Sequence, residues 1–213
     1  MYVPDHFREQ RPEVLRDFIA RHPLGALVTL SEEGLTANHI PMLFSEREGL
    51  AGVLSGHIAR ANPLWKSLAP DTQVLVIFGG PSQYITPSWY PSKQEHGKVV
   101  PTWNYAVVHA HGTIRFNENA ELKLAHLHEM TNAQEASRAE PWKVSDAPPA
   151  FVDVMLKAIV SFEIAVTRLV GKFKASQNRV ESERNAVAEG LRAAGLAPEQ
   201  LEELVREPHT RGG

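Results

Sequence analysis

"GALVTLSEEGLTANHIPMLF" spans Gly25 to Phe44 and contains two apolar runs around a short polar segment. Each run, 25–30 and 35–44, is long enough to form one strand. The four residues between them, Ser31 to Gly34, are typical of a turn, and two strands around such a loop favour a β-hairpin. The stretch therefore predicts an antiparallel pair near the start of the fold.

The remaining apolar runs predict more strands than helices. Further strands are expected at 50–55, 74–78, 102–116 and 162–173, and helices from Pro12, from Asn62-Pro63, and at 119–130, 146–159, 183–194 and 198–206. In the second helix Asn62 is expected to be the cap and Pro63 the first helical residue. Regular helices do not separate the strands, which disfavours a doubly wound parallel sheet. The pattern predicts an α+β, mainly β fold, with an antiparallel sheet closed into a barrel and peripheral helices.

Composition limits the class of protein. The 213 residues are 43% hydrophobic and 22% charged, as in a globular domain of good size. No apolar run approaches the ~20 residues of a membrane span, and the first ten residues contain no apolar leader. The absence of cysteine excludes disulfides and thiol catalysis, and the net charge of -3 makes direct DNA binding doubtful. A cytoplasmic protein without a membrane partner is expected.

The segment "SGHIARANP", residues 55–63, is a candidate anion site. We expect the strand to break at Gly56 and to run into a helix start, where free backbone N–H groups favour a negative charge. Ser55 can donate a hydroxyl, and Arg60 offers a planar fork to a phosphate. The alternative interpretation is a plain helix cap beside a solvated arginine.

The segment "TWNY" places an amide and a hydroxyl beside two aromatic rings at the mouth of a strand. Its members are Thr102, Trp103, Asn104 and Tyr105. A flat ligand ring with a polar edge would use all of these groups, whereas the alternative is that the rings pack in the core.

Two other strand ends carry polar side chains. In "ANHIP", residues 37–41, the proline indicates a strand edge or bulge, where backbone groups can meet a ligand. In "KFKASQNR", residues 172–179, the Gln and Asn amides could read the rim of a heterocycle. The alternative for "ANHIP" is an ordinary edge strand with polar residues facing water. The alternative for "KFKASQNR" is a strand end exposed to solvent.

The histidines do not predict a metal site. His109 and His111 face the same side of a strand, and a closed barrel could bring His39 and His57 near them. No carboxylate joins this set by spacing, so no metal is predicted.

These blocks, taken in order, resemble one family over nearly the whole chain from Met1 to Arg179. They are "LTANHIP", "GHIARANP", "SWYPSK", "HGKVVPTWNYAVVHAHG", "PWKVSDAP" and "KASQNR". The sequence is similar to the PaiB-type FMN-binding negative transcriptional regulators, whose fold is similar to the split β-barrel of pyridoxamine-phosphate oxidases. The resemblance implies a homodimer that holds FMN at the subunit interface. No Gly-rich loop for a second phosphate is visible, which favours FMN over FAD.

The resemblance also implies a set of FMN-binding residues. Ser55 and Arg60 would hold the phosphate, the 38–40 strand would line the isoalloxazine edge, and the remaining groups would approach across the interface. The set is Asn38, His39, Ile40, Ser55, His57, Arg60, Thr102, Trp103, Asn104, Tyr105, Ser176, Gln177, Asn178 and Arg179.

The C-terminal stretch lies outside the matching blocks. We expect residues 1–179 to form the FMN-binding split-barrel domain and residues 180–213 to form a helical extension packed on the barrel or on the dimer partner. A helix-turn-helix over 183–206 is disfavoured, because phosphate would repel its acids, which include Glu199, Glu202 and Glu203.

The leading hypothesis is therefore an FMN-binding homodimer that acts as a negative transcriptional regulator. One alternative is a flavin-dependent oxidoreductase that uses a reduced nicotinamide. Another is a haem-binding or haem-degrading split-barrel protein, because the chain has ten histidines.

Overall fold

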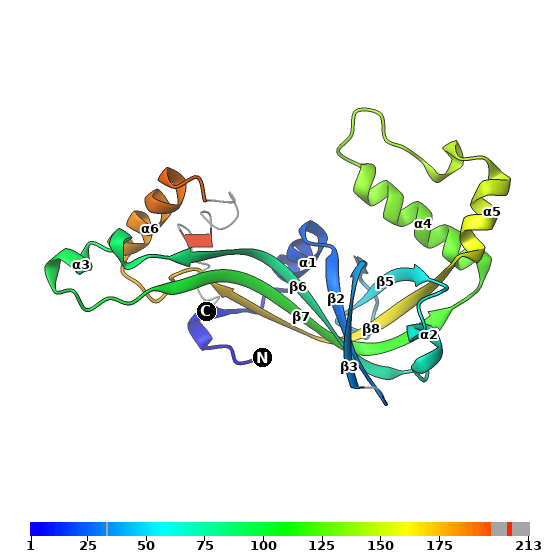
Figure 1. Ribbon diagram of the computed structural model, residues 1–213, viewed down its shortest axis with the longest axis horizontal. Coiled ribbons are helices and arrows are strands. Elements are labelled where there is room, and N and C mark those ends of the chain that lie inside the picture. The colour runs from blue at the N-terminus through cyan, green and yellow to red at the C-terminus, as the bar shows by residue number, and fades with distance from the viewer. Residues whose placement is uncertain (33, 197–203, 206–213) are drawn as a thin grey trace. The chain divides into compact units, whose positions relative to one another are not determined.

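The computed structural model describes residues 1–32, 34–196 and 204–205, and these divide into two compact units (Figure 1). The central unit comprises residues 19–78 and 109–169. The terminal unit comprises residues 1–18 and 79–108 together with the described residues from 170 onward.

Eight strands in the described part of the chain form one sheet. They are β1 (Arg8–Glu9), β2 (Leu24–Ser31), β3 (Gly34–Pro41), β4 (Leu43–Ser45), β5 (Gly52–Ala59), β6 (Thr72–Ile85), β7 (Thr102–Asn117) and β8 (Ile159–Lys174). Their order is β3-β2-β6-β7-β8-β5-β4, and β1 pairs with β8. The pairs β1–β8, β2–β3, β2–β6, β4–β5 and β5–β8 are antiparallel, which confirms the antiparallel, mainly β prediction.

The predicted hairpin is β2–β3, and its two faces differ in burial. On the inner face, Leu27 and Ile40 are buried in the core of the central unit. The register pairs Leu24 with Pro41 and Leu30 with Leu35, which places these residues together on the other face. This outer face consists of Leu24, Ala26, Val28, Leu30, Leu35, Ala37, His39 and Pro41. It is almost entirely apolar, yet Leu30 and Leu35 are 64% and 74% exposed.

Strand β5 continues through Gly56, so the prediction that it breaks there is wrong. Gly56 pairs with Phe162 of β8, and a Cβ at Gly56 would lie 2.5 Å from the Cζ atom of the Phe162 ring. The glycine therefore gives the ring room in the core and does not end the strand.

The helices of the central unit are α2 (Leu64–Ser67), η3 (Val144–Asp146), α4 (Ala120–Glu135) and α5 (Pro149–Lys157). The Asn119 side chain caps α4 by accepting hydrogen bonds from the amides of Glu121 and Leu122 at 2.8 and 3.1 Å. The expected start of α2 is wrong by one residue, because Pro63 is its cap. Helices α4 and α5 pack against each other (Figure 1).

The terminal unit contains η1 (Asp5–Phe7), η2 (Pro87–Trp89), α3 (Ser92–Glu95), α6 (Glu181–Ala193) and the first residues of α1 (Pro12–Arg21). Helix α6 buries Val187, Ala188 and Leu191 against Ile85 and Tyr90. This apolar stripe explains why the predicted 183–194 helix folds onto the sheet. Most of the predicted 198–206 helix, including Glu199, Glu202 and Glu203, lies outside the described residues. None of the helices described here is both long and apolar enough to span a lipid bilayer.

Candidate functional site

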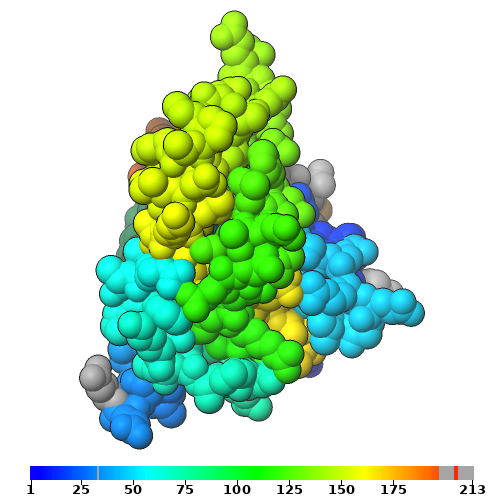
Figure 2. Space-filling view, turned by 90° about the vertical axis from the view of Figure 1, so that its right-hand side faces the viewer, coloured from blue at the N-terminus to red at the C-terminus, as the bar shows by residue number. Residues whose placement is uncertain are grey.

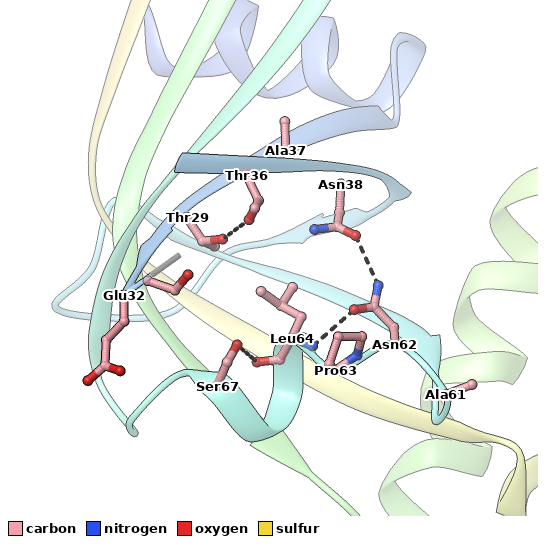
Figure 3. Close-up of a pocket in the computed structure, with 11 residues that line it drawn as sticks. Thr29, Glu32, Thr36, Ala37, Asn38, Ala61, Asn62, Pro63, Leu64 and Ser67 are labelled. Carbon is pink, nitrogen blue, oxygen red and sulfur yellow. Dashed lines mark hydrogen bonds between the residues drawn. The ribbon is translucent and has the colours of Figure 1, made fainter. Parts of the chain in front are cut away.

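A cavity of about 1000 Å³ lies between the β2–β3 hairpin and α2 in the central unit (Figure 3). Its wall includes Thr29, Thr36, Asn38, Asn62, Leu64 and Ser67. Sites for small molecules occupy roughly 300–1,000 Å³, so this cavity has room for a ligand of cofactor size. We call it the amide cavity, after Asn38 and Asn62.

The two asparagines form a bridge across the amide cavity. Asn62 Nδ2 donates a hydrogen bond to Asn38 Oδ1 at 2.9 Å, and Asn62 Oδ1 accepts one from the Leu64 amide at 3.0 Å (Figure 3). Both ends of the Asn62 amide are thus fixed. No hydrogen bond to Asn38 Nδ2 is present within the described residues, so this donor is available to a ligand.

The wall of the amide cavity is polar but carries little charge. Thr29 and Thr36 share a hydroxyl hydrogen bond of 3.0 Å, and Glu32 is the charged residue that lines the cavity within the described chain. Such a wall suits an uncharged heterocycle with hydrogen-bonding groups on its rim. An anionic part of the same ligand would need a cation from outside the wall.

Arg60 is a cation next to the wall in sequence, because it directly precedes Ala61, although its own side chain does not line the cavity. Its Nε donates to the Lys157 carbonyl at 2.7 Å, and its Nη1 pairs with the Glu118 carboxylate. The indole Nε1 of Trp65 donates to the Arg60 carbonyl at 3.0 Å, and the Trp65 ring lies 5.5 Å from the Arg60 Cζ. Arg60 is therefore held in place and is not the freely solvated side chain of the alternative interpretation.

Figure 2 shows the chain segments that surround this arginine. The end of β5 with α2 (cyan), the end of β7 (green) and α5 (yellow) meet on one face. Residues far apart in the sequence thus converge beside the amide cavity, all within the central unit.

Ser55 faces a different space from Asn38. It lines a second cavity of about 450 Å³, bounded by α4 and by β5, β7 and β8. No residue lines both cavities. The structure therefore does not bring Ser55 to the wall that contains Asn38, and its predicted contact with a phosphate stays a prediction.

His57 also turns toward α4. Its Nδ1 lies 3.1 Å from Nε2 of His126, and one ring must donate this hydrogen bond to the other. Burial lowers the pKa of His57, and burial together with the neighbouring His57 lowers the pKa of His126 to about 4. Both rings are therefore neutral near pH 7. Over the described ranges of the chain, no group of three or more His, Asp or Glu side chains is arranged to hold a metal ion.

The two residues that follow Asn38 on β3, His39 and Ile40, do not line the amide cavity. His39 is exposed on the outer face of the hairpin, whereas Ile40 is only 5% exposed in the core. Only backbone atoms of these two residues could therefore accompany Asn38 along the edge of a flavin from this side of the strand.

The terminal unit brings two of the predicted segments together. Asn104 Nδ2 donates to Ser176 Oγ at 3.0 Å, and both side chains are buried. Lys174 Nζ donates to the Thr102 hydroxyl and to the Trp103 carbonyl. The Trp103 ring is 54% exposed, so it is open to a ligand, whereas the Asn104 amide is not.

The rest of the 176–179 segment anchors α6. The Gln177 amide bonds to the backbone of Phe173 and Ala175, and Asn178 is exposed. The guanidinium of Arg179 lies 4.6 Å from the centre of the Tyr90 ring. Arg179 also donates to Glu183 of α6 at 3.2 Å.

Sequence reasoning missed several residues that surround the site. Asn62 was assigned only as a helix cap, and nothing in the pattern pointed to Trp65, Glu118 or His126. Glu118 is 58 positions from Arg60, and His126 is 69 from His57, so spacing along the chain could not have paired them.

Comparison with known proteins identifies the family. Residues 1–168 match the model of the family described as "Putative FMN-binding domain". The chain belongs to this FMN-binding family. It is 34% identical to Protease synthase and sporulation protein PAI 2 of Bacillus subtilis, over 90% of this chain and 89% of the relative. It is also 34% identical to an uncharacterized protein of Emericella nidulans, over 97% of both chains.

Solved structures agree with the expected fold. The FAD and heme binding protein of Mycobacterium smegmatis superposes with a TM-score of 0.57 at 14% identity, over 84% of this chain and 80% of that one. The Azotobacter vinelandii flavocytochrome Anf3 gives a TM-score of 0.56 at 12% identity, over 81% and 72% of the two chains. The fold is a split β-barrel, as predicted.

FMN is the cofactor of the family, and the residues present in the central unit fit it. FMN combines a heterocycle whose rim carries donors and acceptors with a charged phosphate. The amide cavity offers matching polar groups at Asn38, and Arg60 beside it offers the guanidinium that a phosphate prefers.

Proposed function

We propose that this chain is a cytoplasmic homodimer that binds FMN in the amide cavity and acts as a negative transcriptional regulator of the PaiB type. The position of Arg60 next to a polar cavity of low charge carries the proposal, because this pairing matches the two halves of FMN. The resemblance of the sequence to the PaiB-type regulators supports the regulatory role.

In the proposed mechanism this chain's residues bind and orient the flavin. Asn38 Nδ2 donates to an acceptor on the flavin rim, and Arg60 holds the phosphate by a charge-assisted hydrogen bond. FMN supplies a ring that changes charge and shape when it is reduced. Because the net charge is -3, the proposed regulation acts through the state of the bound flavin and does not require a basic DNA-binding surface.

Replacing Arg60 with alanine is expected to weaken FMN binding by roughly 1.5–3 kcal/mol, the usual range for a lost charge-assisted contact. Flavin fluorescence titration of the apoprotein measures this change. Arg138→Ala is the matched control, because Arg138 also pairs with a carboxylate, Glu135, but follows α4 and adjoins no residue of the cavity wall. Equal FMN affinity of Arg60→Ala and the wild type would remove Arg60 from the site.

The outer face of the β2–β3 hairpin supports the proposed dimer. Exposed apolar side chains gathered on one sheet face are typical of an interaction surface. The side chains of Thr29, Thr36 and Asn38 that line the amide cavity lie on the inner face of this hairpin, so the partner would reach the flavin past the edge strand β3. We propose that the partner contributes Trp103, which is open to a ligand.

Mixing Arg60→Ala with Trp103→Ala protein is expected to restore about one FMN site per heterodimer. Each variant alone binds FMN poorly, but if one site takes Arg60 from one chain and Trp103 from the other, one of the two sites is intact. Flavin stoichiometry after co-refolding measures the recovery, with each variant refolded alone as the control. No recovery would place both residues on one chain, and a flavin-loaded monomer in sedimentation would exclude the dimer.

An enzymatic role has a separate signature. Steady-state oxidation of a reduced nicotinamide by the FMN-loaded protein would favour the oxidoreductase alternative over the regulator. An absorption spectrum with haem bands and no flavin bands would overturn the proposal.

A further inference from the structure

Arg60 is fixed by contacts that do not depend on any carboxylate. Its backbone amide donates to the Ala158 carbonyl at 2.8 Å, and its Nε donates to the Lys157 carbonyl at 2.7 Å. Trp65 lies against its guanidinium and also bonds its carbonyl. The backbone and the guanidinium would therefore keep their places if the ion pair with Glu118 were absent.

Glu118 changes the charge around Arg60 but contributes little to the stability of the fold. The Glu118 side chain is 54% exposed, and in the described chain its one hydrogen bond and ion pair is with Arg60 Nη1. It follows the last residue of β7 and lies outside α4, so it fills no core position. Exposed ion pairs contribute little to folding stability, which makes a purely structural role for this carboxylate small.

Two cations also lie near Arg60. The Lys66 ammonium lies 5.0 Å from the Trp65 ring, on the same indole that contacts Arg60. Lys123 is buried nearby and donates to the carbonyls of Leu156 and Ile159. Glu118 therefore neutralises a region that would otherwise attract an anion.

We propose that Glu118 competes with the FMN phosphate for Arg60, so that the carboxylate occupies the guanidinium until the cofactor binds. The inference rests on the proposed function, since it takes Arg60 as the phosphate contact. Glu118 is a positioning residue whose charge lowers the affinity for FMN. It acts on the phosphate alone, because it lines neither cavity.

The opposite role, in which Glu118 improves binding by ordering Arg60, predicts the opposite sign. Ordering of the Arg60 side chain by Glu118 adds little to FMN affinity, because Lys157 and Trp65 already hold the guanidinium. Repulsion between two anions a few ångströms apart is larger than that gain, even at the high dielectric of a protein surface.

The test is a titration of apoprotein with FMN and with riboflavin, which lacks the phosphate. Glu118→Gln is expected to bind FMN about five- to tenfold more tightly than the wild type, with riboflavin affinity unchanged. Glu121→Gln is the matched control, since it removes an exposed acid from the same region without touching Arg60. In the Arg60→Ala background, Glu118→Gln is expected to lose its effect on FMN.

The outcomes separate this inference from the proposed function. Equal or weaker FMN binding by Glu118→Gln, in a protein where Arg60→Ala still weakens FMN, overturns the role of Glu118 alone. A similar gain for riboflavin also overturns it, because the phosphate would not be the group concerned. FMN binding that is insensitive to Arg60→Ala overturns the proposed phosphate site itself.

Discussion

Gly112→Ala is expected to destabilise the protein by about 3 kcal/mol or more. A Cβ at Gly112 would lie 2.3 Å from the backbone oxygen of Ala165 and 2.8 Å from Cγ2 of Ile164. Ala165 cannot easily retreat, because it belongs to β8 and pairs with Val53 of β5 on its other side. The clash must therefore separate β7 from β8 in the core. Denaturant unfolding followed by circular dichroism measures the loss.

Gly79→Ala is the matched control for this substitution. Gly79 also lies within a long strand, β6, but a Cβ there meets no described atom within 4 Å. Its free energy of unfolding should stay within about 0.5 kcal/mol of the wild type. If the two alanine variants were equally stable, the close approach of β7 and β8 at Gly112 would be incorrect.

The wild-type protein is expected to lose stability as the pH falls from about 6.5 toward 4, with His126 responsible for about 3 kcal/mol. The pKa of His126 is about 4 in the folded chain because its ring is buried beside His57, whereas the unfolded chain has the ordinary value. Between these values the unfolded state binds more protons, so acid favours unfolding. Above pH 6.5 this contribution to stability is fully present.

His126→Gln isolates this effect, because glutamine stays neutral and can still bond to His57. Whatever its stability at pH 7, the stability of this variant should fall less steeply between pH 6.5 and 4. His96→Gln is the control, since it removes an exposed histidine outside the buried pair. Parallel pH curves for the wild type and His126→Gln would contradict the buried histidine pair.

The fold was largely predictable because its signals are local. Two apolar runs on either side of Ser31–Gly34 predicted the hairpin, and Asn119 marked the start of α4. Gly56 misled the prediction because a glycine that admits a neighbouring ring resembles, in sequence, a glycine that ends a strand. The difference depends on Phe162, which is over one hundred positions away.

The site was less predictable because its contacts are long-range. The motifs drew attention to Asn38 and Arg60, whose contacts with FMN stay predictions, but not to the carboxylate of Glu118, which pairs with the arginine. Asn104 was expected at a ligand, but its amide bonds to Ser176 in the core. A polar residue in a motif can bind a ligand or form a hydrogen bond inside the core, and only its burial in the structure distinguishes these two roles.

The position of β3 at the end of the sheet order has a consequence for the isolated subunit. Natural edge strands usually carry lysine, proline or a bulge that discourages pairing with other chains. This strand has a proline only at its last residue, Pro41, and its outer side chains are largely apolar. In the proposed dimer, a subunit that loses its partner would therefore present a weakly protected template for strand pairing, and substitutions that break the dimer are expected to promote aggregation.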